Sequence, residues 1–184
     1  SRKGSELYNR VFVVSAYSGI TNALLEDKKT GEPGVYGYIL HDSDQWECAL
    51  EKVRTLMLEY NHSFVSIGLD LIKADSFVNE RLDAIKDCLK SLRYLRTAGH
   101  FRPSDYLPST REFLAAVGEA HSAYNSALIL QANGINARFV DLSGWMSTDV
   151  VTMDEAILKA MENVDYATEM PIVTGYVKYD EGIM

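Results

Sequence analysis

The apolar residues of the chain form two kinds of pattern: short continuous runs, and longer stretches in which apolar positions recur every three or four residues. Continuous runs that are rich in β-branched residues occupy residues 10–15, 135–142 and 170–177, and turn-forming residues flank them. These runs are predicted to be β-strands. The first run is apolar at successive positions, which is typical of a central strand covered on both faces.

The recurring pattern predicts amphipathic helices. A short helix follows the first strand at about residues 21–27. Two long helices come next, one that starts at residues 42–44 and one over residues 76–96. Because no convincing strand separates these two helices, we expect them to form an antiparallel pair beside the sheet, as a helical excursion over about residues 42–98.

Two capping boxes mark the starts of further helices. The first, at residues 109–112, begins a helix that is predicted to end near residue 133, and the second, at residues 152–155, begins one that is predicted to end near residue 168. The prolines upstream predict a loop over residues 100–108. Strands that alternate with helices, with connections long enough for crossovers, predict an α/β fold with a mostly parallel sheet.

Composition and charge restrict the function. The chain of 184 residues is 47% hydrophobic and 24% charged, which is typical of a soluble globular protein of one domain. The net charge of −8 and the lack of any basic run longer than a pair argue against nucleic acid as a partner. No stretch is apolar enough for a membrane span or a signal peptide, so we expect a cytoplasmic protein. Cys48 and Cys88 are predicted to be reduced and mostly buried thiols.

Candidate binding residues follow the first strand and occupy one helix face. Ser15, Ser18 and Thr21 supply hydroxyl groups at a junction between a strand and a helix, where free backbone amides favour anions. Glu119 is surrounded by small side chains at helical spacing, so another segment or a ligand is able to approach it closely. Its neighbour Gly118 weakens a helix and therefore needs a packing or access reason.

Several common motifs are missing from the sequence. There is no P-loop, no GxGxxG after the first strand, no GxSxG elbow and no HExxH or other metal-ligand spacing, so no metal site is predicted. The histidines His41, His62, His100 and His121 are each interpreted as surface residues or as structural residues with hydrogen bonds.

Two segments resemble the motifs of one enzyme family. Residues 13–25, VVSAYSGITNALL, are similar to the VVSAMSGVTNxLL segment of aspartokinases, and residues 117–123 resemble the GExxSAxL motif of the same family. The strand at residues 170–175 follows the order of elements in the kinase domain of aspartokinases. Tyr17 stands where Met or Ala is commoner, and the second motif has a variant spelling around His121.

The resemblance implies the amino-acid kinase fold, a three-layer αβα sandwich with a mostly parallel sheet. It implies transfer of the ATP γ-phosphoryl group to the side-chain carboxylate of L-aspartate, which gives β-aspartyl phosphate for lysine, other aspartate-family amino acids or ectoine. Ser15 and Thr21 match hydroxyl positions that hold aspartate, and Glu119 matches the carboxylate that receives the ammonium group. ATP with Mg²⁺ is the implied co-substrate, no tightly bound cofactor is expected, and the full-length enzyme is expected to form a homo-oligomer.

Departures from the family pattern suggest a fragment. The KxGGTS motif, the GRGGSD-type loop and the regulatory ACT domains are absent from the sequence, so the catalytic Lys, Arg and Asp are expected outside it. Residues 1–184 are thus expected to be an N-terminal part of the kinase domain with little or no activity. Two alternatives stay open: a kinase for another amino acid, such as glutamate or acetylglutamate, and a non-catalytic binding domain that kept the fold.

Overall fold

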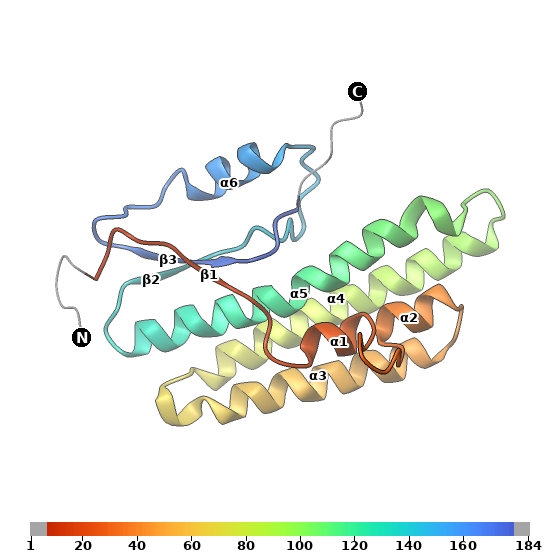
Figure 1. Cartoon of the computed structure of the whole chain (residues 1–184), viewed down its shortest axis with the longest axis horizontal. Helices are drawn as coiled ribbons and strands as arrows, with labels where there is room; N and C mark the ends of the chain where they lie inside the picture. The colour runs from red at the N-terminus through yellow and green to blue at the C-terminus, as the bar shows by residue number, and fades with distance from the viewer. Residues whose placement is uncertain (1–6, 179–184) are drawn as a thin grey trace.

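The computed structural model describes residues 7–178 of the chain. Figure 1 shows a small sheet that is covered by helices, with a helical layer extending to one side. The elements are β1 (Phe12–Val14), α1 (Ile20–Leu24), α2 (Val35–Leu40), α3 (Gln45–Ser63), the 3-10 turn Val65–Ile67, α4 (Leu71–Thr97), α5 (Pro103–Ala132), β2 (Ala137–Val140), α6 (Met153–Met161) and β3 (Met170–Thr174).

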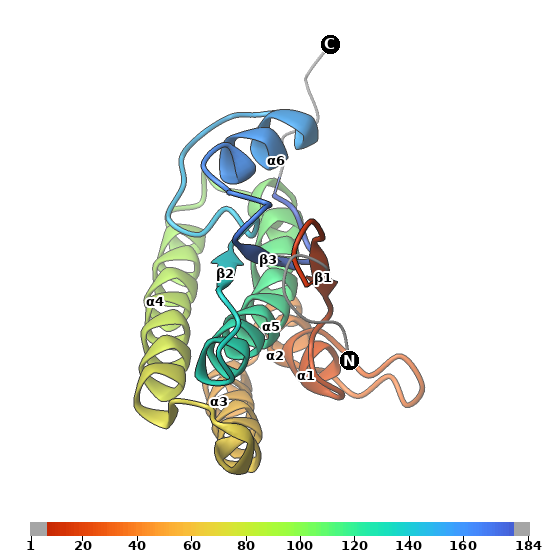
Figure 2. The ribbon, with the colours of Figure 1, turned by 90° about the vertical axis from the view of Figure 1, so that its left-hand side faces the viewer.

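The three strands form a parallel sheet in the order β1-β3-β2, so the predicted α/β class and parallel sheet are confirmed. Helices cover both faces of this sheet (Figures 1 and 2). On one face, Ala123 and Ala127 of α5 pack against Met170 and Ile172 of β3. On the other face, α6 packs against the opposite side of β2 and β3. The small side chains of α5 let this helix lie close to the strands.

Among residues 7–178, the first strand lies at an edge of the sheet, which differs from the predicted central position. Within residues 7–178, β1 pairs only with β3, and Phe12 and Val13 are 44% and 66% exposed. The central strand is β3, all of whose residues are buried. A run of apolar residues reports how hydrophobic the two faces of a strand are, but it does not report how many strands are paired with it.

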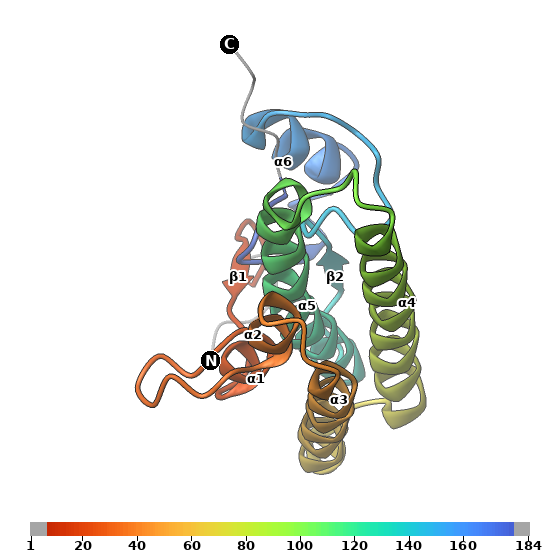
Figure 3. The same ribbon diagram turned by 90° about the vertical axis from the view of Figure 1, so that its right-hand side faces the viewer.

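A layer of helices packs on the side of α5 that faces away from the sheet (Figure 3). The predicted antiparallel pair is formed by α3 and α4, which pack against each other. Both predicted apolar stripes lie in the core between these helices. The buried side chains are Trp46, Leu50, Val53 and Met57 of α3, and Val78, Leu82, Ile85 and Leu89 of α4.

Some helix limits differ from the prediction because the caps differ. The helix α4 begins at Leu71, five residues early, because the Asp70 side chain accepts a hydrogen bond from the Lys73 amide. The helix α6 begins at the predicted box, where Thr152 and Glu155 bond reciprocally, but it ends at Met161.

The loop predicted over residues 100–108 was also wrong. The helix α5 begins at Pro103, and the Asp105 carboxylate accepts a hydrogen bond from the Arg102 amide. Proline suits the first position of a helix because its missing N–H has no intrahelical partner there. Pro108 removes one backbone bond inside the helix but lies at its exposed end. Within residues 7–178, no helix is both long enough and apolar enough to cross a membrane.

The two cysteines are exposed, so the prediction that they are mostly buried was wrong. Cys48 is two residues from the buried Trp46, which places it on a different face of α3. Cys88 likewise directly precedes the buried Leu89 on α4.

Close packing of α5 against α1 explains why position 118 is a glycine. A Cβ atom at this position would lie 2.8 Å from Cγ2 of Ile20 and 3.0 Å from Cβ of Ala16. The helix α5 therefore touches α1 and the turn before it, and this contact holds the turn at residues 15–19 against the middle of α5.

The substitution Gly118→Ala is expected to lower the free energy of unfolding by about 1 kcal/mol. Overpacking costs about 1–3 kcal/mol, and the gain in helix propensity returns at most about 1 kcal/mol. Urea denaturation measures the change, and Cys88→Ala, at an exposed position of α4, serves as a control within about 0.5 kcal/mol of the unmodified chain. A Gly118→Ala chain that is more stable than the unmodified chain would contradict the close contact.

Candidate functional site

The candidate site lies where β1 and β3 end, beside the middle of α5. Ser15 follows β1 and Gly175 follows β3, and the Gly175 amide donates a 3.1 Å hydrogen bond to the Val14 carbonyl. Ligands of open α/β sheets bind outside the carboxyl ends of the strands, which is where these residues lie.

Glu119 projects from α5 toward this edge of the sheet. A Cβ atom at position 175 would lie 2.9 Å from Oε2 of Glu119, so a larger residue there would displace this carboxylate. Oε2 is buried and has no hydrogen-bond partner among the residues that the structure describes. Burial raises the pKa of Glu119, and a hydrogen bond from the Tyr176 amide opposes this effect. A carboxylate oxygen in this position is suited to accept hydrogen bonds from a compact cation such as an ammonium group.

The backbones of Ser15 and Glu119 lie close together, on either side of the Ser122 side chain. Oγ of Ser122 lies 2.7 Å from the Ser15 carbonyl oxygen and 3.0 Å from the Glu119 carbonyl oxygen, so its single O–H is shared between the two acceptors. The Ser15 side chain is exposed to solvent. Ser122 thus joins the backbone of the Ser15 turn to that of α5 at Glu119, while Oε2 of Glu119 itself is buried.

Thr21 is placed less directly. It is the second residue of α1, which has only five residues and follows Gly19 in a left-handed conformation (φ 81°). The predicted helix to residue 27 was too long, and so short a helix offers little dipole for an anion. The preceding residue, Ile20, packs near Gly118. No hydrogen bond joins the Thr21 side chain to Ser15 or Glu119 within residues 7–178, so its role stays a prediction.

Aromatic residues from α3, which the sequence did not single out, fix the turn that carries Ser15 and Ser18. The Tyr60 hydroxyl donates a 2.8 Å hydrogen bond to the Ser18 carbonyl. The ring of Tyr17 stacks on Tyr60 with 4.8 Å between centroids, and it meets His121 edge-on at 5.3 Å. Contacts between residues about 40 and 100 positions apart leave no local pattern in a sequence, although the unusual Tyr17 was noted in the motif.

His121 is completely buried and belongs to a network of polar side chains, which confirms its structural interpretation. Its Nε2 lies 2.7 Å from Oδ1 of Asn61 and 3.0 Å from Nδ2 of Asn125. Asn61 in turn donates a 2.8 Å hydrogen bond to Asp75 of α4. Burial lowers the pKa of His121 to about 3, so the ring is neutral at physiological pH.

A second group of residues lies at the same edge of the sheet, after β2. The carboxylate of Asp141 pairs with Arg81 of α4 at 2.6 Å, and the Arg81 guanidinium lies between the rings of Phe77 and Trp145, at 4.7 and 4.2 Å. This attaches the loop at residues 141–151 to the helical layer. The sequence pattern did not single out this loop, because residues 135–142 were predicted to be strand throughout, whereas β2 ends at Val140 and Asp141 follows it as Ser15 follows β1.

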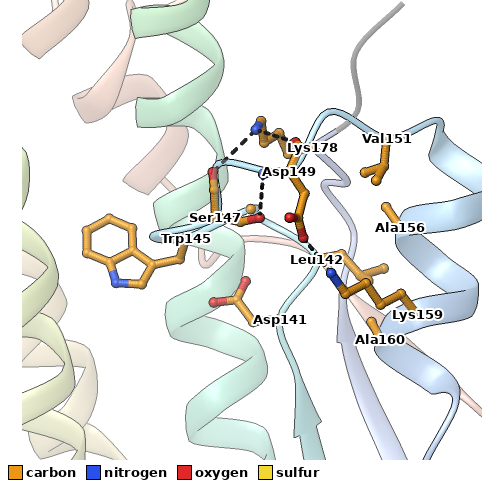
Figure 4. A pocket seen from close by; sticks show the side chains of 11 residues that line it. Asp141, Leu142, Trp145, Ser147, Asp149, Val151, Ala156, Lys159, Ala160 and Lys178 are labelled. Atoms are coloured by element: carbon orange, nitrogen blue, oxygen red, sulfur yellow. Dashed lines mark hydrogen bonds and ion pairs between the residues drawn. The ribbon is translucent and has the colours of Figure 1, made fainter.

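Two cavities flank this loop. One of about 360 Å³ lies between the loop and α6 (Figure 4), and one of about 610 Å³ lies between the loop and the N-terminal part of α5. Lys178 lines both cavities. No group of three or more His, Cys, Asp or Glu side chains within residues 7–178 is arranged to hold a metal ion.

The fold and the site define an α/β protein with a buried carboxylate at the carboxyl edge of a parallel sheet. Over 185 aligned residues, the chain is 45% identical to the aspartate kinase Ask_Ect of Stutzerimonas stutzeri (strain A1501). The alignment covers the whole chain but 39% of the relative. No protein-family model matches the chain, and no solved structure matches it significantly. The similarity to an aspartate kinase confirms the resemblance that the two motifs indicated.

The buried His121 predicts a specific dependence of stability on pH. Between about pH 6.5 and 3 the unfolded chain binds a proton at this residue and the folded chain does not, so stability falls as the pH is lowered through this window. The contribution is at most about 1.4 kcal/mol per pH unit. The variant His121→Gln is expected to show a shallower fall in urea denaturation, whereas His62→Gln, at an exposed position, keeps most of the slope.

A direct titration of the imidazole avoids any loss of stability in the variant. In the unmodified chain, NMR is expected to find His121 neutral below pH 5. A midpoint near the ordinary value of 6.5 would contradict the burial of a neutral ring.

Proposed function

We propose that this chain forms the aspartate-binding part of an aspartate kinase catalytic domain with the three-layer amino-acid kinase fold. In this proposal, the helices over about residues 42–98 are an excursion from that fold. The observation that carries the proposal is the buried Oε2 of Glu119, which has no hydrogen-bond partner within residues 7–178 and lies at the strand edge beside Ser15. The similarity of the whole chain to an aspartate kinase supports the same function.

Each residue has a proposed role in holding the substrate. Glu119 receives the ammonium group of L-aspartate, because a buried carboxylate with a free oxygen favours a compact cation. The hydroxyls of Ser15 and Thr21 donate to the carboxylates of the substrate. Ser122, Tyr60 and Gly118 keep the Ser15 turn in place. Positioning is the main task of a protein in phosphoryl transfer, so these contacts would orient the carboxylate that accepts the phosphoryl group.

The reaction of the whole protein is also part of the proposal. The chain spans 39% of the length of its relative, so ATP, the phosphoryl transfer to the aspartate side chain and the assembly into a homo-oligomer are proposed for the complete enzyme. The residues that the structure describes offer no cluster of metal ligands, and we derive no step through Mg²⁺ from them. The name of the relative does not single out the lysine branch, so we propose the reaction and leave its pathway open.

Ligand binding to the chain tests the proposed ammonium contact. L-aspartate is compared with succinate, which has both carboxylates but no ammonium group, by calorimetry or NMR titration. The unmodified chain is expected to prefer aspartate, and Glu119→Gln is expected to weaken aspartate binding about 10- to 150-fold, the loss of one charge-assisted hydrogen bond of about 1.5–3 kcal/mol. Succinate binding is expected to change much less.

The matched control is Glu59→Gln, which removes an exposed carboxylate from α3 and is expected to leave aspartate binding unchanged. Equal aspartate affinity in Glu119→Gln and the unmodified chain would disprove the ammonium contact. A preference for glutamate over aspartate would favour a kinase for another amino acid.

For the chain by itself we expect no aspartate-dependent ADP production, and measurable turnover would contradict this expectation.

A further inference from the structure

The two cavities beside the loop at residues 141–151 share one positively charged side chain, Lys178. Its backbone amide donates a 2.8 Å hydrogen bond to the Leu142 carbonyl, which fixes its position after β3. Its Nζ lies 3.5 Å from the Ser147 carbonyl and 3.3 Å from the Asp149 carbonyl (Figure 4). The aliphatic part lies against Gly144, where a Cβ atom would collide with it.

The carboxylates around Lys178 already have other cationic partners, and Lys178 acts on Asp149 only through its longer-range field, which helps to lower the pKa of Asp149. Three carboxylates line the cavities and each has a cationic partner. The pairs are Asp141 with Arg81 at 2.6 Å, Asp149 with Lys159 at 2.5 Å and Glu112 with Arg111 at 3.7 Å. Lys178 forms no ion pair with the carboxylates that the structure describes. Its ammonium group has three N–H donors and two carbonyl contacts, so one donor remains available.

Hydroxyl groups surround the same space. Ser109, Ser143 and Ser147 line the larger cavity together with Lys178. Oγ of Ser143 is buried and has no hydrogen-bond partner among the described residues. One ammonium group and several hydroxyls suit a phosphate, which carries two negative charges and three accepting oxygens. The rings of Phe113 and Tyr176 also line this cavity, and at about 610 Å³ it has room for an organic group attached to the phosphate.

We propose that the larger cavity binds a small phosphate ester, with Lys178 as the cation that contacts the phosphate and Ser143 as a hydroxyl donor. The lining of this cavity does not include Glu119: Glu112 at its wall and Glu119 are two helical turns apart, about 10 Å along α5, and Tyr176, whose amide donates to Glu119, lies between the two places. The inference therefore stands whether or not Glu119 receives an ammonium group.

Titrations of the chain with inorganic phosphate and with adenosine 5′-monophosphate, followed by NMR, test the proposal. Both ligands are expected to shift the amide signals of residues 143–147 and 178, and the ester is expected to bind at least tenfold more tightly than phosphate alone. Lys178→Met, which keeps the aliphatic stem, is expected to weaken both affinities at least tenfold. Lys178→Arg, which keeps the charge, is expected to retain most of the affinity.

Lys52→Met is the matched control, because it makes the same change of charge at a lysine that lines a different cavity. It is expected to leave phosphate binding unchanged. If Lys178→Met does not fold, Ser143→Ala carries the same test with a smaller expected loss of about three- to tenfold. Glu119→Gln is expected to bind phosphate normally, so a failure of the aspartate proposal is seen separately.

Three results would overturn the proposal. The first is that neither ligand binds when its concentration is raised to about 50 times a dissociation constant of about 1 mM, which is already a weak affinity for a small ligand. The second is equal binding by Lys178→Met and the unmodified chain, which would mean that Lys178 only caps the loop carbonyls. The third is an equal loss of affinity in Lys52→Met, which would indicate unspecific attraction of anions to the surface.

Discussion

The structure depends on the close approach of α5 to the ends of the strands. This approach requires positions without bulky side chains on both sides of the contact. Gly118 admits Ala16 and Ile20, Gly175 admits the Glu119 carboxylate, and Ser122 is small enough to donate to the Ser15 carbonyl. The same face continues through Ala123 and Ala127, on which β3 packs. A single helix, α5, thus covers one face of the sheet and also borders the candidate site.

This geometry explains the electrostatics of Glu119. A carboxylate between a helix and a strand end loses hydration, which raises its pKa, and the Tyr176 amide restores only part of what water supplied. The residual cost favours any ligand that brings a hydrogen-bond donor with positive charge. The helical layer contributes indirectly, because Tyr60 and the buried network of Asn61, His121 and Asn125 keep the Ser15 turn from moving away.

Local patterns predicted most of the elements, and contacts between distant residues decided what the patterns missed. The stripes of α3 and α4 and the capping box at Thr152 followed from spacing alone. The edge position of β1 depends on which strands pair with it. The start of α5 depends on which proline occupies the first position of the helix: it is Pro103, and Pro108 lies inside the helix. Ser15 and Glu119 stand out in the sequence through a strand-to-helix junction, a face of small residues and two motifs. Arg81, Tyr60 and Lys178 contact residues that are too far away in sequence for any local pattern.

The charges along the strand edge have a direction. Glu119 lies beside Gly175, and Lys178 shares a cavity with Glu112, which is two helical turns before Glu119. A carboxylate with a free oxygen therefore lies at one end and an ammonium group without a carboxylate partner among residues 7–178 lies at the other. A cationic group is therefore favoured near Glu119 and an anionic group near Lys178, because the reverse arrangement would place like charges together.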